Sequence, residues 1–267
     1  MLHRADVAGL VVITQPTHAW VAGQLARAWG TARFPRPEPW EEVCVAAERH
    51  DDGWLAWEAA PTLDPATGHP FSFLELPRLE HLAIWSTAGP TVLALGRYPA
   101  LLVSLHGTGL YERDDSAHGS IDDAEAVQAF LDQEHAFQTR LLTDLQSDPR
   151  FAVHAAPDAI TRNRRLIAVW DALSLAICGG QRERRRIGGV PTVDGETLLS
   201  VLPDSNDPTR VAVTPWPFAE EVVTLRFEGR HLPGRFTDAA TMRAALAHAP
   251  WVSFAVRLNP ATVDEMA

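Results

Sequence analysis

Apolar residues recur at helical spacing through the chain up to about residue 180. A helix is predicted over residues 18–30, ending at a glycine, and the spacing resumes over 41–58 after a proline-rich loop. Four later segments show the same spacing and are predicted to be helices: 79–88, 97–106, 122–147 and 157–179. Residues 59–80 are rich in Pro, Gly and Asp, so we expect a long, packed loop there.

The pattern changes near residue 190, where short apolar runs are separated by Pro, Gly, Asn and Asp, as is typical of strands. The predicted strands lie in the runs 190–203, 210–218, 220–233 and 251–260, with a short helix at 238–249. An early apolar run at 9–14 is also predicted to be a strand and is a candidate partner for that sheet. We therefore predict a mainly α protein, with a helical domain over 1–189 and a smaller β-rich C-terminal extension over 190–267 packed on it.

Composition narrows the class of protein. The chain of 267 residues is 46% hydrophobic and 21% charged, as expected for a globular protein. Its net charge is −11, and all 23 basic residues are arginine. The absence of lysine excludes a Schiff-base lysine and a P-loop. The acidic balance argues against a protein that coats nucleic acid.

The expected location is a reducing cytoplasm, because two cysteines are too few for a disulfide scaffold. The N-terminal segment lacks the apolar stretch of a signal peptide, and no segment approaches the roughly 20 apolar residues of a membrane helix. We therefore expect a soluble, cytoplasmic protein whose partner is a small molecule rather than a membrane or a nucleic acid.

Candidate chemistry begins with the adjacent pair His50-Asp51. The pair follows a helical pattern and precedes Gly53, which lets the chain bend so that both side chains can face one cation. Imidazole together with carboxylate suits Zn, Mn or Fe better than Ca. A structural alternative is that these two residues only cap a helix.

Three other residues strengthen the metal interpretation. His18 begins a helix, and His106 is expected to end another, where Gly107 would let the backbone approach a ligand. Asp171 lies within the apolar helix RRLIAVWDALSLAIC, and a carboxylate there needs a metal or an ion pair, with Arg164 or Arg165 as the alternative partner.

The order His18, His50-Asp51, Asp171 resembles the H…HD…D pattern of the HD-domain superfamily of metal-dependent phosphohydrolases. The resemblance implies an HD-domain-like helical bundle holding one or two divalent transition metal ions (Zn, Mn or Fe). The ligands implied are His18, His50, Asp51, His106 and Asp171, with His81 and His135 as further candidates. Asp51 and His106 would be the catalytic residues, His106 either binding a second metal or donating a proton to the leaving oxygen.

Four longer segments also look like a bacterial family known only by a domain-of-unknown-function label. The matching pieces are ITQPTHAWVAGQLARAW, HDDGWLAWEAAPTLDPATGHPFSF, LLVSLHGTGLY and WDALSLAIC. This resemblance covers nearly the whole chain and implies no activity.

The function predicted from these residues is hydrolysis of a phosphoester of a small molecule or nucleotide. An anionic substrate needs local positive charge, which Arg164 and Arg165 would supply, because guanidinium groups suit phosphate. Trp54 would stack on a base or sugar, and the loop 59–76 would close over the site. Two alternatives stay open: an HD-fold di-iron oxygenase, which needs a further His such as His135, and a non-catalytic ligand-binding module.

Overall fold

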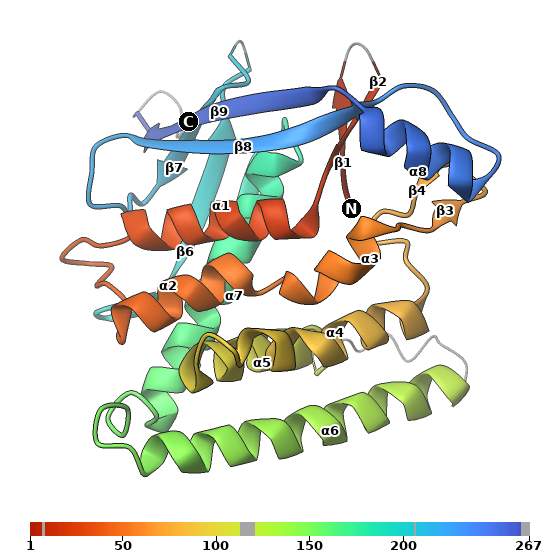
Figure 1. Ribbon diagram of the computed structural model, residues 1–267. Coiled ribbons are helices and arrows are strands. Elements are labelled where there is room, and N and C mark those ends of the chain that lie inside the picture. The colour runs from red at the N-terminus through yellow and green to blue at the C-terminus, as the bar shows by residue number, and fades with distance from the viewer. Residues whose placement is uncertain (7–8, 113–120, 206, 263–267) are drawn as a thin grey trace.

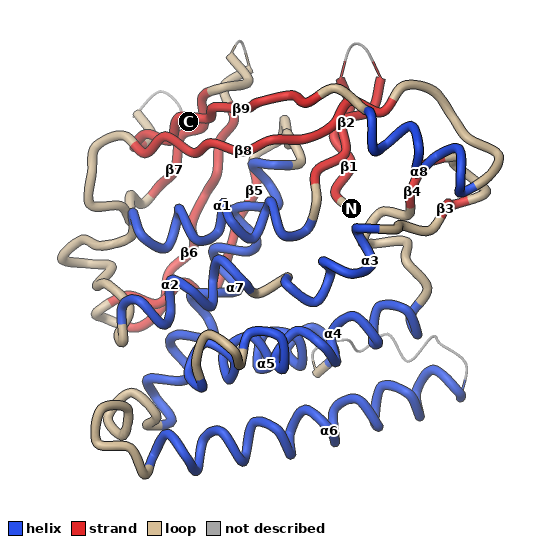
Figure 2. The backbone as a smooth tube through the Cα atoms, viewed as in Figure 1, coloured by secondary structure: helices blue, strands red, loops and turns tan. Residues whose placement is uncertain are grey.

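The computed structural model describes residues 1–6, 9–112, 121–205 and 207–262. Its largest feature is a seven-stranded sheet whose strands come from both ends of the chain. The seven strands are β1 (Leu2–Asp6), β2 (Gly9–Ile13), β5 (Arg185–Thr192), β6 (Gly195–Pro203), β7 (Arg210–Thr214), β8 (Val223–Leu232) and β9 (Trp251–Pro260). Their order is β1-β2-β8-β9-β7-β6-β5, antiparallel throughout except for the parallel pair β7 and β9. Figure 2 shows the strands gathered on one side of the molecule.

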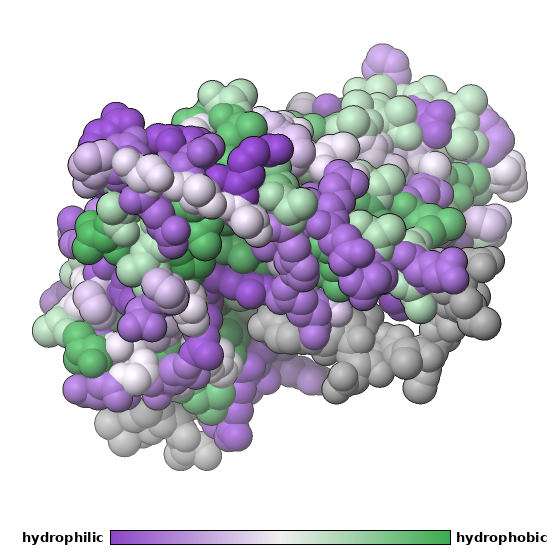
Figure 3. Space-filling view, turned by 90° about the horizontal axis from the view of Figure 1, so that it is seen from below, coloured by the Kyte–Doolittle hydropathy of each residue, from purple (hydrophilic) through white to green (hydrophobic). Residues whose placement is uncertain are grey.

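The helices form layers beneath this sheet. They are α1 (Gln15–Ala28), α2 (Trp40–Arg49), α3 (Leu55–Ala59), α4 (Arg78–Val92), α5 (Arg97–Tyr111), α6 (Ile121–Gln146), α7 (Pro157–Cys178) and α8 (Ala239–His248), with a 3₁₀ turn η1 (Asp52–Trp54) and a small hairpin of β3 (Leu63–Asp64) and β4 (His69–Pro70). In Figure 1, α1 lies directly under the sheet, α6 lies farthest from it, and α7 crosses the layers between them. On the face seen in Figure 3, hydrophobic and hydrophilic side chains are interspersed.

The predicted mainly α class is therefore wrong, because the fold is mixed α/β. The helices were predictable from their apolar spacing, whereas the sheet is assembled from both ends of the chain. Strand β1 has the sequence LHRAD and β5 the sequence RRIGGVPT, so each carries charge or glycine in place of an apolar run. The early strand, β2, does pair with the C-terminal strand β8, with Val11 opposite His231. The domain boundary predicted between residues 189 and 190 falls inside β5.

Strand β2 places the first turn of α1 next to the core. The hydroxyl of Thr14 accepts the backbone N–H of Thr17 at 3.1 Å and caps the helix, and Pro16 lies in its first turn, where it has no helical bond to lose. Val21, Leu25 and their neighbours are buried against the sheet and α7. A short connection thus carries the chain directly from the sheet into the helix that contains His18.

Two predicted helices differ in extent. The segment 41–58 is broken into α2, η1 and α3, with the break at His50. Helix α5 continues past His106 to Tyr111, so His106 lies within a helix instead of ending one. A Cβ at Gly107 would lie 2.8 Å from the indole of Trp85, so this glycine lets α4 and α5 pack closely and does not serve a ligand. Among the described residues, no helix is long and apolar enough to cross a membrane.

Candidate metal centre

Five residues from four elements converge in the interior. His18 comes from the first turns of α1, His50 and Asp51 from the end of α2, His106 from α5 and Asp171 from α7. Four of these side chains are buried, and that of Asp171 is 17% exposed, so the centre opens on the Asp171 side. The structure thus brings together all five residues predicted as metal ligands.

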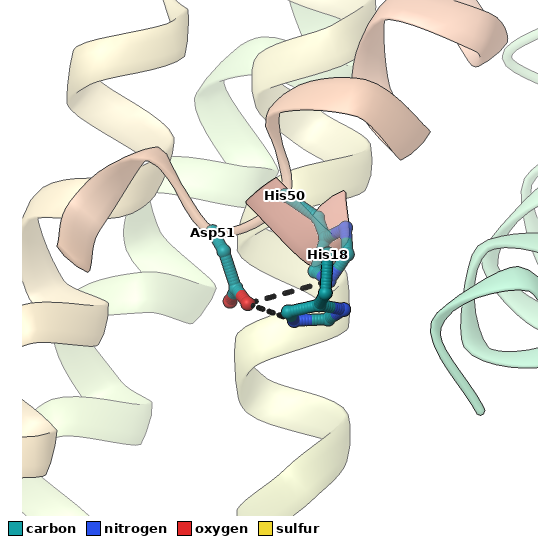
Figure 4. A group of neighbouring side chains, drawn as sticks. All are labelled: His18, His50 and Asp51. Carbon is teal, nitrogen blue, oxygen red and sulfur yellow. Dashed lines mark hydrogen bonds and ion pairs between the residues drawn. The ribbon is translucent and has the colours of Figure 1, made fainter. Parts of the chain in front are cut away.

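The turn after α2 is shaped by its packing on α4. A Cβ on Gly53 would lie 2.5 Å from the backbone oxygen of Ile84 and 3.0 Å from Cβ of Ala88, so only glycine allows this approach. Asp51 precedes that contact by two residues and turns its carboxylate back toward α1. Figure 4 shows this carboxylate facing both imidazoles, from His18 and from His50.

The tautomer of His18 follows from its partners. Its Nδ1 lies 2.9 Å from Oγ of Ser174, whose hydroxyl donates to the backbone oxygen of Asp171 at 2.8 Å. Because that hydroxyl proton is already used, Nδ1–H of His18 is the donor and Oγ accepts. Nε2 faces Asp51, whose Oδ2 is 2.5 Å away, a hydrogen-bond distance that requires a proton between the two atoms when no metal is bound.

His50 is oriented in the same way. Its Nδ1–H donates to the backbone oxygen of Ala47 at 2.8 Å, which leaves Nε2 as the free nitrogen. This Nε2 is buried and has no hydrogen-bond partner among the described residues. It lies 3.6 Å from Oδ2 of Asp51 and 3.5 Å from Oδ1 of Asp171, too far for a good hydrogen bond.

The separations of 3.6 and 3.5 Å around Nε2 of His50 fit a shared cation, whereas the 2.5 Å between Nε2 of His18 and Oδ2 of Asp51 would have to lengthen for both atoms to bind one ion. Two ligands that each lie about 2.1 Å from one ion are roughly 3–3.5 Å apart at the usual bond angles. Potential ligand atoms fall within 4.8 Å of one another in two groups, one made of His18, His50 and Asp51 and the other of His50, His106 and Asp171. The structure therefore contains His/Asp clusters that are able to hold a metal ion.

The electrostatics of the centre also call for positive charge. Burial alone would lower the pKa of His50, but the carboxylates of Asp51 and Asp171 outweigh it and raise that pKa to about 9. Burial would raise the pKa of Asp171, but the imidazoles of His50 and His106 hold it below its ordinary value. The carboxylates of Asp51 and Asp171 thus both favour a positive charge between them. In a metal-free centre, a proton on His50 supplies that charge.

His106 has the opposite character. Burial, together with the neighbouring charge on His50, lowers its pKa to about 4 despite the attraction of Asp171. Its Nε2 lies 3.7 Å from Oδ2 of Asp171. At neutral pH His106 is therefore a neutral imidazole next to the most exposed carboxylate of the centre.

A cavity of about 340 Å³ opens onto the candidate metal centre. Its residues outside the centre are mostly aromatic or aliphatic: Gln15, Trp54, Phe73, Leu74, Leu76, Arg78, His81, Trp85, Leu110, Tyr111 and Leu175. The predicted substrate residue Trp54 belongs to this wall, and its ring packs edge-on against Trp57 with centroids 5.7 Å apart. The predicted covering loop 59–76 contributes Phe73, Leu74 and Leu76 to the cavity.

The two further histidine candidates lie in different places. His81 lines the cavity, but both of its nitrogens are engaged: Nε2 accepts the indole N–H of Trp85 at 3.2 Å, and Nδ1 bonds the hydroxyl of Tyr111. His135 is exposed on α6 and lies 3.1 Å from the carboxylate of Glu112. Neither histidine belongs to the His/Asp clusters of the described residues.

The predicted arginines lie in a second groove of about 690 Å³, which shares His106, Leu110 and Asp171 with the first cavity. Arg164 donates to Glu112 at 2.5 Å, and Arg165 forms an ion pair with Glu196. Neither guanidinium is the partner of Asp171, which faces the histidines instead. Both arginines are thus adjacent to the centre and already paired with carboxylates.

Several residues of the site are not apparent from sequence patterns. Gln15 and Ser174 occupy ordinary helical positions, and Trp85 and Tyr111 look like core aromatic residues. The spacing of Gln15, one turn before His18, and of Ser174, one turn after Asp171, is the signal that would have found them.

Fold and site together define a mixed α/β protein with a buried His/Asp centre beside an aromatic cavity. The chain belongs to the family described as proteins of unknown function (DUF3891), whose model matches residues 1–234. No curated protein and no solved structure matches the chain.

Proposed function

We propose that the protein is a metal-dependent hydrolase that cleaves a phosphoester of a small molecule or nucleotide. The observation that carries the proposal is the convergence of two imidazole Nε2 atoms, from His18 and His50, on the carboxylates of Asp51 and Asp171. Electron-rich atoms buried so close together need a positive charge between them, which a metal ion or a proton supplies. Imidazole with carboxylate suits Zn, Mn or Fe.

One ion fits the centre better than two. The two clusters share His50, whose Nδ1 is already bonded to Ala47, so its single free nitrogen can bind only one ion. His18, His50, Asp51 and Asp171 would hold that ion. The Nδ1–H bonds from His18 to Ser174 and from His50 to Ala47 fix both rings in the orientation that a metal ligand needs.

A bound divalent ion polarises a phosphoryl oxygen and makes water a nucleophile near neutral pH. The neutral imidazole of His106 would then accept a proton from the attacking water, which fits its lowered pKa better than the proton-donor role suggested by its sequence position. The negative carboxylates of Asp51 and Asp171 would balance the positive charge of the bound ion. Arg164 and Arg165 in the adjoining groove would attract an anionic substrate.

The di-iron oxygenase alternative gains no support from the geometry of the described residues. It requires a further histidine ligand, whereas both nitrogens of His81 are engaged and His135 is exposed beside Glu112. We therefore keep a single proposed function.

Metal analysis of the purified protein after reconstitution with Zn, Mn or Fe is the first test, with about one equivalent bound per chain expected. Asp51→Ala should abolish this binding, and His248→Ala, at an exposed position on α8, should leave it unchanged. The second test is release of 4-nitrophenol from mono- and bis(4-nitrophenyl) phosphate and of phosphate from nucleoside monophosphates. Binding below about a tenth of an equivalent, or a metal-loaded protein that cleaves none of these esters, would refute the proposal.

A further inference from the structure

The side chains that line the cavity beside the candidate metal centre are suited to bind an aromatic ring. Trp54, Phe73, Trp85 and Tyr111 contribute rings to its wall, and leucines complete it. Among its described residues outside the centre, Arg78 alone carries a full charge at neutral pH. An apolar, aromatic wall of this kind favours a flat, uncharged group.

Hydrogen bonds hold part of this wall rigid and neutral. The indole N–H of Trp85 donates to Nε2 of His81, so the proton of that imidazole is on Nδ1, which donates to the hydroxyl of Tyr111. Two hydrogen bonds thus join three side chains from two helices. The rings of His81 and Trp85 pack edge to face with centroids 6.2 Å apart, and the rings of His81 and Tyr111 are tilted, with centroids 5.9 Å apart. A ligand would meet a preformed surface there.

A second, independent feature points to a ligand. Gln15 is only 3% exposed, lines the cavity, and lies one turn before the proposed metal ligand His18. Its Oε1 has no hydrogen-bond partner among the described residues, and neither has Nε1 of Trp54 in the same wall. A buried acceptor and a buried donor without partners are costly unless something in the cavity satisfies them.

We infer that the substrate carries an uncharged aromatic ring that occupies this cavity and donates a hydrogen bond to Oε1 of Gln15. This assignment rests on the proposed function, since the phosphoryl group of the same molecule would lie on the metal centre. The ring would also cover Leu74, which lines the cavity although it is 80% exposed. Gln15 therefore determines specificity, because its Oε1 accepts a hydrogen bond from a polar substituent on the ring.

Phosphonates test this inference without any hydrolysis, because they lack an ester bond. Titration calorimetry on the metal-loaded protein would compare methylphosphonate, phenylphosphonate, and 3- and 4-hydroxyphenylphosphonate. We expect phenylphosphonate to bind at least about tenfold more tightly than methylphosphonate, from burial of the ring. The better hydroxyphenyl isomer should bind about tenfold more tightly again, because a phenolic hydroxyl can donate to Gln15 and accept from Trp54.

Gln15→Leu should abolish only the gain from the hydroxyl group and keep the preference for phenyl over methyl. The matched control is Gln24→Leu on the same helix, where Gln24 bonds the backbone of Arg226 in β8 and not the cavity. Gln24→Leu should keep both preferences.

Methyl- and phenylphosphonate of equal affinity, or phenylphosphonate that does not bind, would overturn the ring assignment, and this comparison needs no variant. Gln15→Leu that weakens all the phosphonates equally would overturn the specificity role. Failure of the proposed hydrolase looks different: ring-dependent binding would persist while no phosphoester is cleaved.

Discussion

Nε2 of His50 lies 3.5 Å from Oδ1 of Asp171, although the two residues come from helices far apart in the sequence. The contact joins the end of α2 to the middle of α7 and is longer than a hydrogen bond. Together with Asp51 on the other side of the same nitrogen, it outlines the space for a cation.

Removing one negative charge from this space should weaken metal binding. Asp171→Asn keeps the size of the side chain, but its amide is a poor ligand for Zn, Mn or Fe. We expect the metal affinity to fall by at least about 10–100-fold, the range that losing even a supporting contact can cause. Competition with a chromophoric chelator measures the change. Asp132→Asn, at an exposed position on α6, serves as the control, and equal affinities of the two variants would contradict the assignment.

Gly53→Ala should damage stability and the centre together. The added methyl group would meet backbone atoms of Ile84 and Ala88, which cannot move aside as a flexible side chain can. We expect a loss of about 1–3 kcal/mol in the free energy of unfolding, measured by urea denaturation, and weaker metal binding because Asp51 shifts. Gly188→Ala is the matched control, since its methyl group would meet only Leu198, at 3.8 Å. An unchanged unfolding midpoint for Gly53→Ala would show that the turn tolerates a side chain.

Glu58 should make stability depend on pH. Burial raises its pKa to about 7, although the amino group of Met1 and the N–H of Gln15 favour the charged form. Between the ordinary value of 4.5 and about 7, the folded state holds a proton that the unfolded state has released. The contribution of Glu58 to stability therefore falls as pH rises through this window and is constant above it.

Glu58→Gln removes that titration, so the melting temperature of the variant relative to the wild type should rise between pH 4.5 and pH 7. Glu125→Gln, at an exposed position on α6, should follow the wild type at every pH. Parallel profiles for Glu58→Gln and the wild type would mean that Glu58 is ionised throughout.

A buried polar network between α5 and α6 provides another test. The Ser104 hydroxyl donates to Oε2 of Glu134 at 2.6 Å, and the amide of Gln138 donates to Oγ of Ser104 at 2.9 Å. Burial raises the pKa of Glu134 even with this support from Ser104. Ser104→Ala should cost about 1–3 kcal/mol at pH 7, measured by denaturant unfolding.

The cost should be smaller at pH 5, because without its donor the Glu134 pKa rises further and the carboxyl group is more readily protonated. Ser86→Ala, which loses a bond to the backbone oxygen of Ala83 in α4, is the control and should cost less. A cost for Ser104→Ala that does not vary with pH would indicate that Glu134 is already neutral.

Two candidate ligands, His106 and Asp171, were predictable because each lies in an apolar helical pattern, whereas His18 was predictable from its place at the start of a helix. Asp171 is the clearest example, since a carboxylate between Trp170 and Leu173 needs a partner wherever the helix packs. The pair His50-Asp51 was predictable from its place at the end of a helical pattern, two residues before Gly53.

The fold class was not predictable from local patterns, because strand pairing depends on residues distant in the sequence. Apolar and polar residues alternate only weakly along β1. The segment is recognisable as a strand only from its pairing with β2, in which Leu2 lies opposite Ile13. The place of the further histidine candidates was not predictable for a related reason. Nothing local distinguishes His81, which lines the cavity, from His135, which does not, because only the packing of α4 on η1 and α5 separates them.

The pairing of β2 with β8 has a consequence for synthesis on the ribosome. His18 follows directly from β2, yet the neighbour that holds β2 in the sheet, residues 223–232, is made near the end of translation. The helix that carries the candidate ligand His18 therefore gains its final support only when almost the whole chain has been made, and such long-range pairing is slow to form. Until then the candidate site is incomplete, so we expect a metal ion to bind only in the last stage of folding.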